Sequence, residues 1–309
     1  MRRFHRWALA GGLAALLLAG AALMFAAELP LEPPHYSGQS VTAAFEGWFP
    51  NPDGTFSILL GYYNRNLTQE LDIPIGPDNR IDPGGPDQGQ PTHFLPGRQW
   101  GLFTVTVPKD FGTTNKLSWT IVANGKPTVV PFSLDPLWII SPLVDASDNT
   151  PPFITFGLAA PTVQGPRPMV IERTIAGGNR MPLTVWVADD AKTPPGALPS
   201  RTKGTPVTVK WSKFRGPGDV TFSEAGPKVE ESDWAAPPPA VFTGKAETIA
   251  TFSEPGDYLL RVVANDISGD GGRGFQCCWT NAFVKVSVGR AEAADKGVLP
   301  CRSGMHCGR

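Results

Sequence analysis

Short runs of alternating apolar and polar residues, separated by glycine and proline, restrict what this chain can fold into. In residues 101–107, Phe103, Val105 and Val107 would face one side of an extended strand, while Thr104 and Thr106 would face the other. The 34 glycines and 33 prolines among the 309 residues lie between such runs, which is typical of many turns joining many strands. No segment has a sustained apolar period of 3.6 residues, so we expect an all-β protein.

The predicted strands fall into two groups, which we expect to form two immunoglobulin-like β-sandwich domains after an N-terminal signal or anchor segment. The first group contains a hairpin across Asn124 and Gly125, a pair typical of two-residue hairpin turns. Several short strands in each group, bounded by turn residues, favour a sandwich. The expected segments are residues 1–27 (signal peptide or N-terminal anchor), 28–40 (linker), 41–140 (first sandwich), 141–168 (Pro-rich linker), 169–289 (second sandwich) and 290–309 (Cys-containing tail).

The first 27 residues have the composition of an export signal. Arg2, Arg3 and Arg6 precede an uncharged stretch rich in Leu and Ala, which ends with Ala26 and Ala27. This stretch is also long enough to span a bilayer, so a cleaved signal peptide and an uncleaved N-terminal anchor are both open interpretations. In either case we expect the rest of the chain to be exported, to the periplasm, the cell surface or the medium, with no membrane contact other than such an anchor.

The charge balance argues against a nucleic-acid partner. Residues 1–27 contain three arginines and no acid, so the remaining chain has 24 basic and 28 acidic side chains. A basic patch with interleaved aromatic residues, as nucleic-acid-binding proteins usually have, is missing from this sequence. We therefore expect the partner to be a protein or a glycan of the exported compartment.

Four cysteines, at positions 277, 278, 301 and 307, lie near the C-terminus. In an oxidising compartment an even number suggests disulfides, and four cysteines allow three connectivities. A ring between the neighbours Cys277 and Cys278 would be strained. We therefore favour links from this pair to Cys301 and Cys307.

The second group of strands resembles a polycystic-kidney-disease (PKD) type immunoglobulin-like domain over about residues 169–289. The resemblance rests on Trp211-Ser212-Lys213 with the segment 216–223, on the segment 250–258 that ends at Tyr258, and on Asn265-Asp266. It implies that Trp211 and Tyr258 lie in the core of a sandwich. Members of this family serve as spacers, adhesion modules and enzyme appendages, so the resemblance implies a fold and no activity. The chain departs from the pattern in an insertion at residues 192–205 and a lengthened segment at residues 267–281. The whole chain also resembles exported bacterial proteins with the same two-domain layout.

The motifs of common catalytic sites are missing from the sequence. It contains no G-x-S-x-G or H-E-x-x-H pattern. After residue 27 the histidines are His35, His93 and His306, and we expect His93 to be a hydrogen-bonded loop residue. Residues 269–274 match G-x-G-x-x-G, but a strand follows where a dinucleotide site needs a helix. We therefore expect no enzyme activity and no catalytic residue.

An acidic constellation suggests a calcium site, as a hypothesis. Asp266, Ser268 and Asp270 have the spacing of the first half of a calcium-binding loop. Cys277 stands where the bidentate Glu of such a loop belongs, so a second loop would have to complete the site. Asp189 and Asp190 begin the segment that would lie at the same end of an immunoglobulin-like sandwich. The alternative is a set of solvated loop acids in a glycine-rich turn.

These observations favour an exported structural, adhesion or interaction module that acts through the end loops of its sandwiches. The alternative is a carbohydrate-binding module or a carbohydrate-active accessory protein. The polar loop at residues 76–98 supplies groups that could bind sugar hydroxyls. The exposure of four tryptophans tests this alternative, which would lose its main support if all of them were buried. They are Trp48, Trp100, Trp138 and Trp279.

Overall fold

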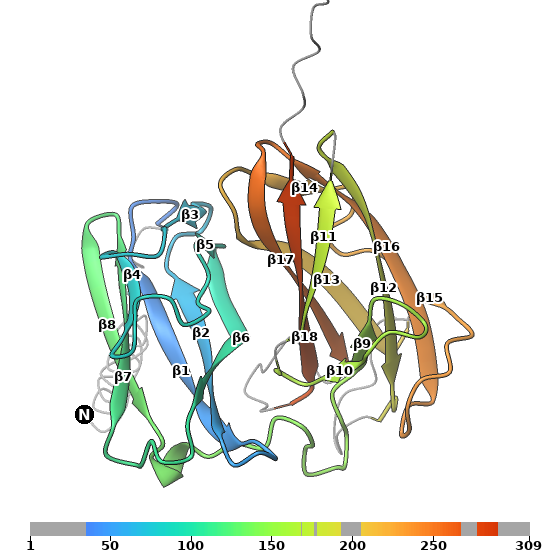
Figure 1. The fold of residues 1–309 in the computed structure, drawn as a ribbon, viewed down its shortest axis with the longest axis horizontal. Coiled ribbons are helices and arrows are strands. Elements are labelled where there is room, and N and C mark those ends of the chain that lie inside the picture. Colours follow the sequence, from blue (N-terminus) through green and yellow to red (C-terminus); the bar gives the residue numbers. More distant parts are fainter. Residues whose placement is uncertain (1–34, 168, 176–177, 193–204, 267–276, 290–309) are drawn as a thin grey trace, which may run out of the picture. The chain divides into compact units, whose positions relative to one another are not determined.

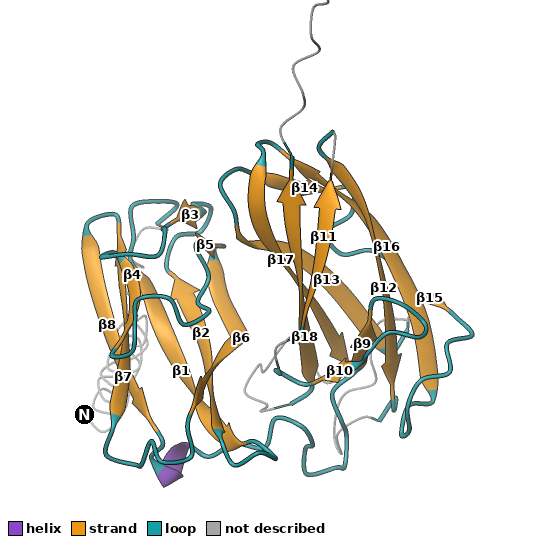
Figure 2. Cartoon of the chain, in the orientation of Figure 1, coloured by secondary structure: helices purple, strands orange, loops and turns teal. Residues whose placement is uncertain are grey.

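The computed structural model describes residues 35–167, 169–175, 178–192, 205–266 and 277–289. Strands dominate these ranges, and the one helical element within them is the short 3-10 turn η1 (Pro136–Trp138) (Figure 2). The predicted all-β class is therefore confirmed. No helix in these ranges is long and apolar enough to cross a membrane. The described residues from Tyr36 onward belong to one compact unit.

The first sandwich consists of two three-stranded sheets and a two-stranded ribbon (Figure 1). Side chains from both sheets, among them Ile58, Phe103 and Trp119, meet in one core. One sheet has the order β1 (Val41–Pro50), β2 (Phe56–Asn64), β6 (Gly97–Val107); the other has the order β4 (Asn79–Asp82), β7 (Lys116–Ala123), β8 (Lys126–Ser133); and the ribbon pairs β3 (Leu71–Asp72) with β5 (His93–Phe94).

The hairpin predicted at Asn124 and Gly125 is present. Both residues have positive φ angles, 52° and 71°, as a two-residue type I′ turn requires. Strands β7 and β8 pair in register on either side, from Ala123 opposite Lys126 onward. This turn chemistry was readable from the sequence because few residues other than Asn and Gly adopt such angles without cost.

The second sandwich has two larger sheets. Their inner faces share a core that contains Trp211 and Tyr258, both of which are at most 2% exposed, as the family resemblance implied. One sheet has the order β10 (Val163–Gln164), β9 (Phe153–Thr155), β12 (Arg180–Asp189), β16 (Phe242–Phe252), β14 (Val220–Phe222), with β15 (Glu230–Glu231) also paired to β16; the other has the order β11 (Val170–Ile175), β18 (Trp279–Val288), β17 (Gly256–Asp266), β13 (Val207–Arg215).

Two short strands lie in the stretch that the sequence suggested as a linker. β9 pairs with β12, and β10 pairs with β9. The hydroxyl of Thr155 donates a 3.0 Å hydrogen bond to the carbonyl oxygen of Pro161, which holds the turn between them. Residues 153–164 therefore extend a sheet of the second sandwich.

The sheet β11–β18–β17–β13 is covered on both faces along much of β17 and the first half of β18. Strand β17 is buried at every residue from 260 to 266, whereas a strand with one wet face alternates between buried and exposed residues. Phe214 of β13 and Phe283 of β18 belong to the core of the first sandwich, and their ring centroids lie 5.0 Å apart. The first sandwich thus packs on the outer face of this sheet, and we call this face the shared floor.

A close contact between Gly101 and Trp279 joins the two sandwiches at one end of this floor. Gly101 has a φ of +48°, and a Cβ atom there would lie 2.1 Å from the Trp279 ring. The indole nitrogen of Trp279 donates a 3.1 Å hydrogen bond to the Gly101 carbonyl oxygen. A small cluster of buried apolar side chains surrounds the ring: Phe49, Leu59, Ile140 and Val263.

Candidate ligand-binding pocket between the sandwiches

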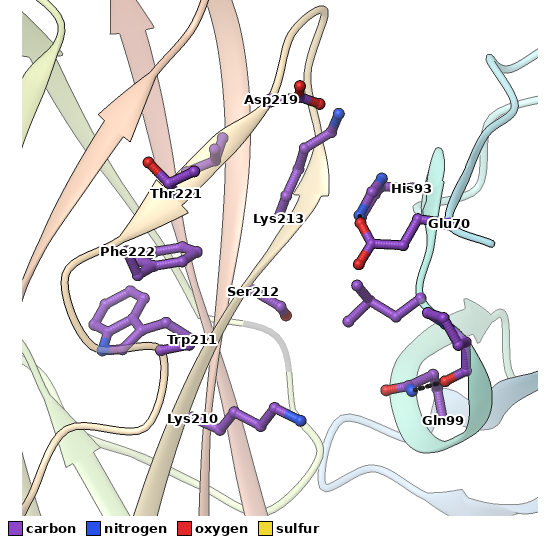
Figure 3. Close-up of a pocket in the computed structure, with 14 residues that line it drawn as sticks. Glu70, His93, Gln99, Lys210, Trp211, Ser212, Lys213, Asp219, Thr221 and Phe222 are labelled. Carbon is purple, nitrogen blue, oxygen red and sulfur yellow. Dashed lines mark hydrogen bonds and ion pairs between the residues drawn. The ribbon is translucent and has the colours of Figure 1, made fainter. Parts of the chain in front are cut away.

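A hollow of about 710 Å³ separates part of the second sandwich from the first. Strands β13 and β14 form one wall, and the segments around β5 and the start of β6 form the other. Figure 3 shows Lys210 and Ser212 directed from β13 towards Gln99 and His93, while Trp211 lies on the other side of the strand. Over residues 210–212 the period of two therefore directs Trp211 to the core and its two neighbours to the polar wall.

An ion cluster fixes the upper part of this wall. The two ring nitrogens of His93 lie 3.2 Å from a Glu70 carboxylate oxygen and 3.0 Å from an Asp72 carboxylate oxygen. The Lys213 ammonium group lies 2.9 Å from the same Asp72 oxygen and donates a 2.9 Å hydrogen bond to the Gly218 carbonyl oxygen. The cluster thus ties β13 to the ribbon of the first sandwich.

His93 has no nucleophile beside it within the described residues. Both of its ring nitrogens face carboxylates, and only 7% of the residue is exposed. It lies on the short strand β5 and not in the loop that the sequence suggested. Its environment is that of a buried structural ion cluster, since a general base needs a hydrogen-bonded proton donor on the reacting side.

Polar residues of the loop at 76–98 have structural partners in place of the sugar ligands considered for them. The Asn79 side chain is fully buried, donates to the Ile73 and Pro91 carbonyl oxygens and accepts a 2.9 Å hydrogen bond from the Trp119 indole. Asp87 accepts two hydrogen bonds, of 2.9 and 2.8 Å, from the Arg215 guanidinium. These bonds hold the pKa of the Asp87 carboxyl below its ordinary value and link the loop to β13.

A smaller hollow of about 160 Å³ adjoins the first and shares Gln99 and Lys210 with it. It is lined by cations: Arg98, Lys210 and Arg261. The Arg98 guanidinium lies 3.9 Å from the centroid of the Trp100 ring and donates a 2.6 Å hydrogen bond to Glu46.

Glu46 is the acid that accompanies these cations. Burial raises the pKa of its carboxyl, and the nearby Arg98 opposes that rise. Its second carboxylate oxygen accepts a 2.7 Å hydrogen bond from the Gly101 amide. Both oxygens of Glu46 are therefore engaged by the protein.

The acids suggested for calcium occupy the end of the second sandwich where the sequence placed them. Asp189, Asp190 and Asp266 are 1%, 8% and 4% exposed, so they are not solvated loop acids. Burial raises the pKa of Asp189 to about 8, and the charges of Asp266 and Asp190 add to the rise. The other two suggested ligands, Ser268 and Asp270, lie outside the described residues.

The contacts of these carboxylates differ. Asp190 accepts hydrogen bonds from the amide and hydroxyl of Thr150 and from the Lys192 amide, so its oxygens are occupied. Asp266 accepts a 2.6 Å hydrogen bond from the Asn149 amide group. Within the described ranges, no three His, Cys, Asp or Glu side chains are grouped as a metal site. Calcium binding therefore stays a prediction.

The cysteine pairing differs from the one favoured above. Cys277 and Cys278 form a disulfide with each other, whereas Cys301 and Cys307 lie outside the described residues. The peptide bond between the two residues is cis, and their Cα atoms are 3.1 Å apart. Both sulfur atoms approach the Asn149 carbonyl oxygen, at 3.7 and 3.5 Å. The side chains thus point the same way, which the preference for cross-links to the tail did not foresee.

The four tryptophans that bear on carbohydrate binding are not all buried. Trp48 and Trp279 are 9% and 1% exposed. Trp100 is half-buried beside the smaller hollow, and Trp138 of η1 is 52% exposed. Because not all four tryptophans are buried, the carbohydrate alternative keeps its main support.

Comparisons with known proteins show only distant likenesses. No protein-family model matches the chain, and no curated protein matches it. The solution structure of amebosin is 16% identical, with a TM-score of 0.22, and covers 40% of this chain and 96% of its own. The fibronectin(III)-like modules of Clostridium thermocellum CbhA are 13% identical, with a TM-score of 0.20, and cover 81% of this chain and 94% of their own.

A third solved structure, cadherin-like domains 1 to 4 of zebrafish RET, is 12% identical with a TM-score of 0.24. The alignment covers 68% of this chain but only 40% of the RET fragment, so this chain corresponds to less than half of that fragment. Likenesses of this degree carry no conclusion about function. The β-sandwich architecture rests on the sheets and cores described above, and the PKD resemblance of the second sandwich stays a prediction.

Proposed function

We propose that this protein is an exported, non-catalytic interaction module of the periplasm or cell surface that binds its ligand in the hollow between the sandwiches. The proposal rests on the packing between the two sandwiches. Phe214 and Phe283, on strands of the second sandwich, lie in the core of the first and therefore hold the two walls of the hollow together. A site whose walls are fixed before binding loses little conformational entropy when the ligand arrives. Structural and adhesion roles belong to the same proposal, since both act by binding.

The non-catalytic part of the proposal is supported by how the reactive side chains are used. His93 and Lys213 are both engaged with Asp72. A nucleophile activated by an adjacent base is not found beside them in the described part of the chain. The end loops, which the sequence favoured as the binding surface, include residues 193–204 and 267–276 and lie largely outside the described residues.

Carbohydrate binding is the second candidate, and two observations favour it. The hollow is lined by groups that can bond sugar hydroxyls, among them Gln99, Ser212 and Thr221. Trp100 lies beside the adjoining smaller hollow, and aromatic rings with a polar edge suit the amphipathic faces of sugars.

A variant that fills the hollow tests the proposal. Ser212→Tyr places a ring in the space between the walls, and Ser287→Tyr is its control, because Ser287 is also half-exposed on a strand of the same sheet but does not line the hollow. We expect a ligand found on a glycan array or in a screen of exported proteins to bind the wild type and Ser287→Tyr and to lose binding to Ser212→Tyr.

Two outcomes would contradict the proposal. Equal binding by both variants would move the site away from the hollow, for example to the end loops. Mass spectrometry of the bound glycan after prolonged incubation should show an unchanged ligand, and the appearance of cleaved products would show that the protein is an enzyme.

A further inference from the structure

Arg261 is a buried cation that has no acid in direct contact among the described residues. It is only 7% exposed and lies on β17 opposite Ser212 of β13. Its Nε atom donates a 2.9 Å hydrogen bond to Asn281. Neither of its Nη atoms donates to an acceptor in the described ranges. A buried charge without a direct partner is costly, so this group needs an explanation.

The neighbouring charges do not neutralise it. Glu46, the acid whose field reaches Arg261, already accepts hydrogen bonds from Arg98 and from the Gly101 amide. Lys210, which lines the same hollow from the neighbouring strand β13, is exposed and makes no ion pair with any residue that the structure describes. Three cations thus share one acid, and the hollow has an excess of positive charge.

Burial lowers the pKa of Arg261 to about 10, which still leaves the guanidinium charged at neutral pH. An oxyanion would relieve the cost of this charge. The guanidinium plane can donate two parallel hydrogen bonds to a carboxylate, sulfate or phosphate group. The 160 Å³ of the smaller hollow is room for such a group, and the 710 Å³ hollow, which shares Gln99 and Lys210 with it, leaves space for the rest of the ligand.

We propose that the hollow lined by Arg261, Lys210 and Trp100 binds the oxyanion of an acidic saccharide, with the neutral part of the sugar in the adjoining larger hollow. This inference rests on the proposed function and specifies its ligand class. The saccharide follows from the larger hollow, where hydroxyl, amide and carboxylate groups lie beside apolar side chains such as Val220 and Phe222, which suits the hydroxyl groups and the apolar C–H faces of a sugar.

The test compares acidic and neutral forms of the same saccharide. Isothermal titration calorimetry of the wild-type protein would use a uronic-acid oligosaccharide, its methyl ester, a sulfated oligosaccharide and inorganic sulfate. We expect at least one acidic oligosaccharide to bind about fivefold or more tightly than its neutral form, because a charge-assisted hydrogen bond is stronger than a neutral one. The affinities for the sulfated and the uronic-acid oligosaccharides show which oxyanion, sulfate or carboxylate, is preferred.

Lys210→Met removes one cation without disturbing the core, because Lys210 is exposed. Its matched control is Lys116→Met, an exposed lysine on β7 that lines neither hollow. We expect Lys210→Met to weaken acidic binding about fivefold and Lys116→Met to leave it unchanged. Arg261→Lys, which keeps a charge but loses the planar donor pair, should weaken it further; if that variant does not fold, Lys210→Met still decides.

The possible failures differ from each other. Equal affinity for the acidic and neutral forms, or equal effects of the two lysine variants, would overturn the oxyanion site and leave the proposed function standing. Binding of inorganic sulfate alone, without any saccharide, would overturn the saccharide part. If neither glycans nor exported proteins bind, the proposed function fails together with this inference.

Discussion

The Asp189 side chain shows how the fold sets the charge of a single residue. One of its oxygens accepts a 2.8 Å hydrogen bond from the Ala191 amide, and the other is buried without a hydrogen bond to a described residue. The unpartnered Asn149 amide oxygen is also buried nearby, on the side chain that bonds to Asp266. An acid in such surroundings favours its neutral form, because desolvation and like charges both oppose ionisation.

Asp189 should make the protein less stable at alkaline pH. Its pKa rises from the ordinary value of 3.8 to about 8 in the fold, so the folded state holds this proton more tightly than the unfolded chain. The resulting stabilisation is complete below about pH 4, declines as the pH rises towards 8 and is lost above it. Between about pH 5.5 and pH 8.5, the free energy of unfolding should fall less for Asp189→Asn than for the wild type, as measured by urea titrations.

The exposed Asp110 provides the control, since Asp110→Asn should follow the wild-type pH dependence. Calcium adds a second comparison at the same residue. If the acids at this end bind Ca²⁺, thermal melting in excess Ca²⁺ should give a higher midpoint than melting with chelator, and Asp189→Asn should abolish the difference. An unchanged wild-type midpoint would count strongly against calcium binding.

Among the strands, the sequence indicated the longer ones and missed the shortest ones. The hairpin β7–β8 was predicted because the pair Asn124-Gly125, typical of a two-residue hairpin turn, separates its two runs. The strands β10 and β14 are two and three residues long, which is too short for a period to show. The convergence of Asp189 with Asp266 was anticipated from topology. The hollows were not, because their walls come from segments far apart in the chain, such as β5 and β13.

The interlock between β6 and β18 depends on one glycine. A methyl group on Gly101 would meet the Trp279 ring, and the positive φ would strain an alanine as well. We expect Gly101→Ala to destabilise the protein by about 2–4 kcal/mol, from overpacking and the left-handed backbone together. Chemical denaturation followed by circular dichroism measures this loss.

Gly125→Ala separates the cost of overpacking from the cost of the left-handed backbone in that experiment. Gly125 also has a positive φ, but a Cβ atom added to it would have open space within 4 Å. Its substitution should therefore cost only the backbone part, about 1–2 kcal/mol. Equal losses for the two variants would show that the Trp279 contact contributes nothing.

For the whole molecule, the shared floor predicts that the two sandwiches unfold together. Phe214 belongs to β13 of the second sandwich but packs in the core of the first, against Phe103 and Phe283. We expect one cooperative transition for the wild type. Phe214→Ala should cost about 3–5 kcal/mol and separate the transition into two, as seen by calorimetry.

The matched variant is Phe222→Ala, since Phe222 lies at the edge of the second core and contacts Trp211. It should lower stability without dividing the transition. Two transitions in the wild type would mean that the contact between the sandwiches adds little to the stability of either.

Because one sheet contributes side chains to both cores, neither sandwich can be transferred unchanged to another protein. A fragment that begins after the first sandwich would present Phe214, Val263, Trp279 and Phe283 to water, and exposed apolar surfaces of this kind promote aggregation. Anyone wishing to graft the C-terminal sandwich onto another scaffold would first have to redesign that face with polar side chains.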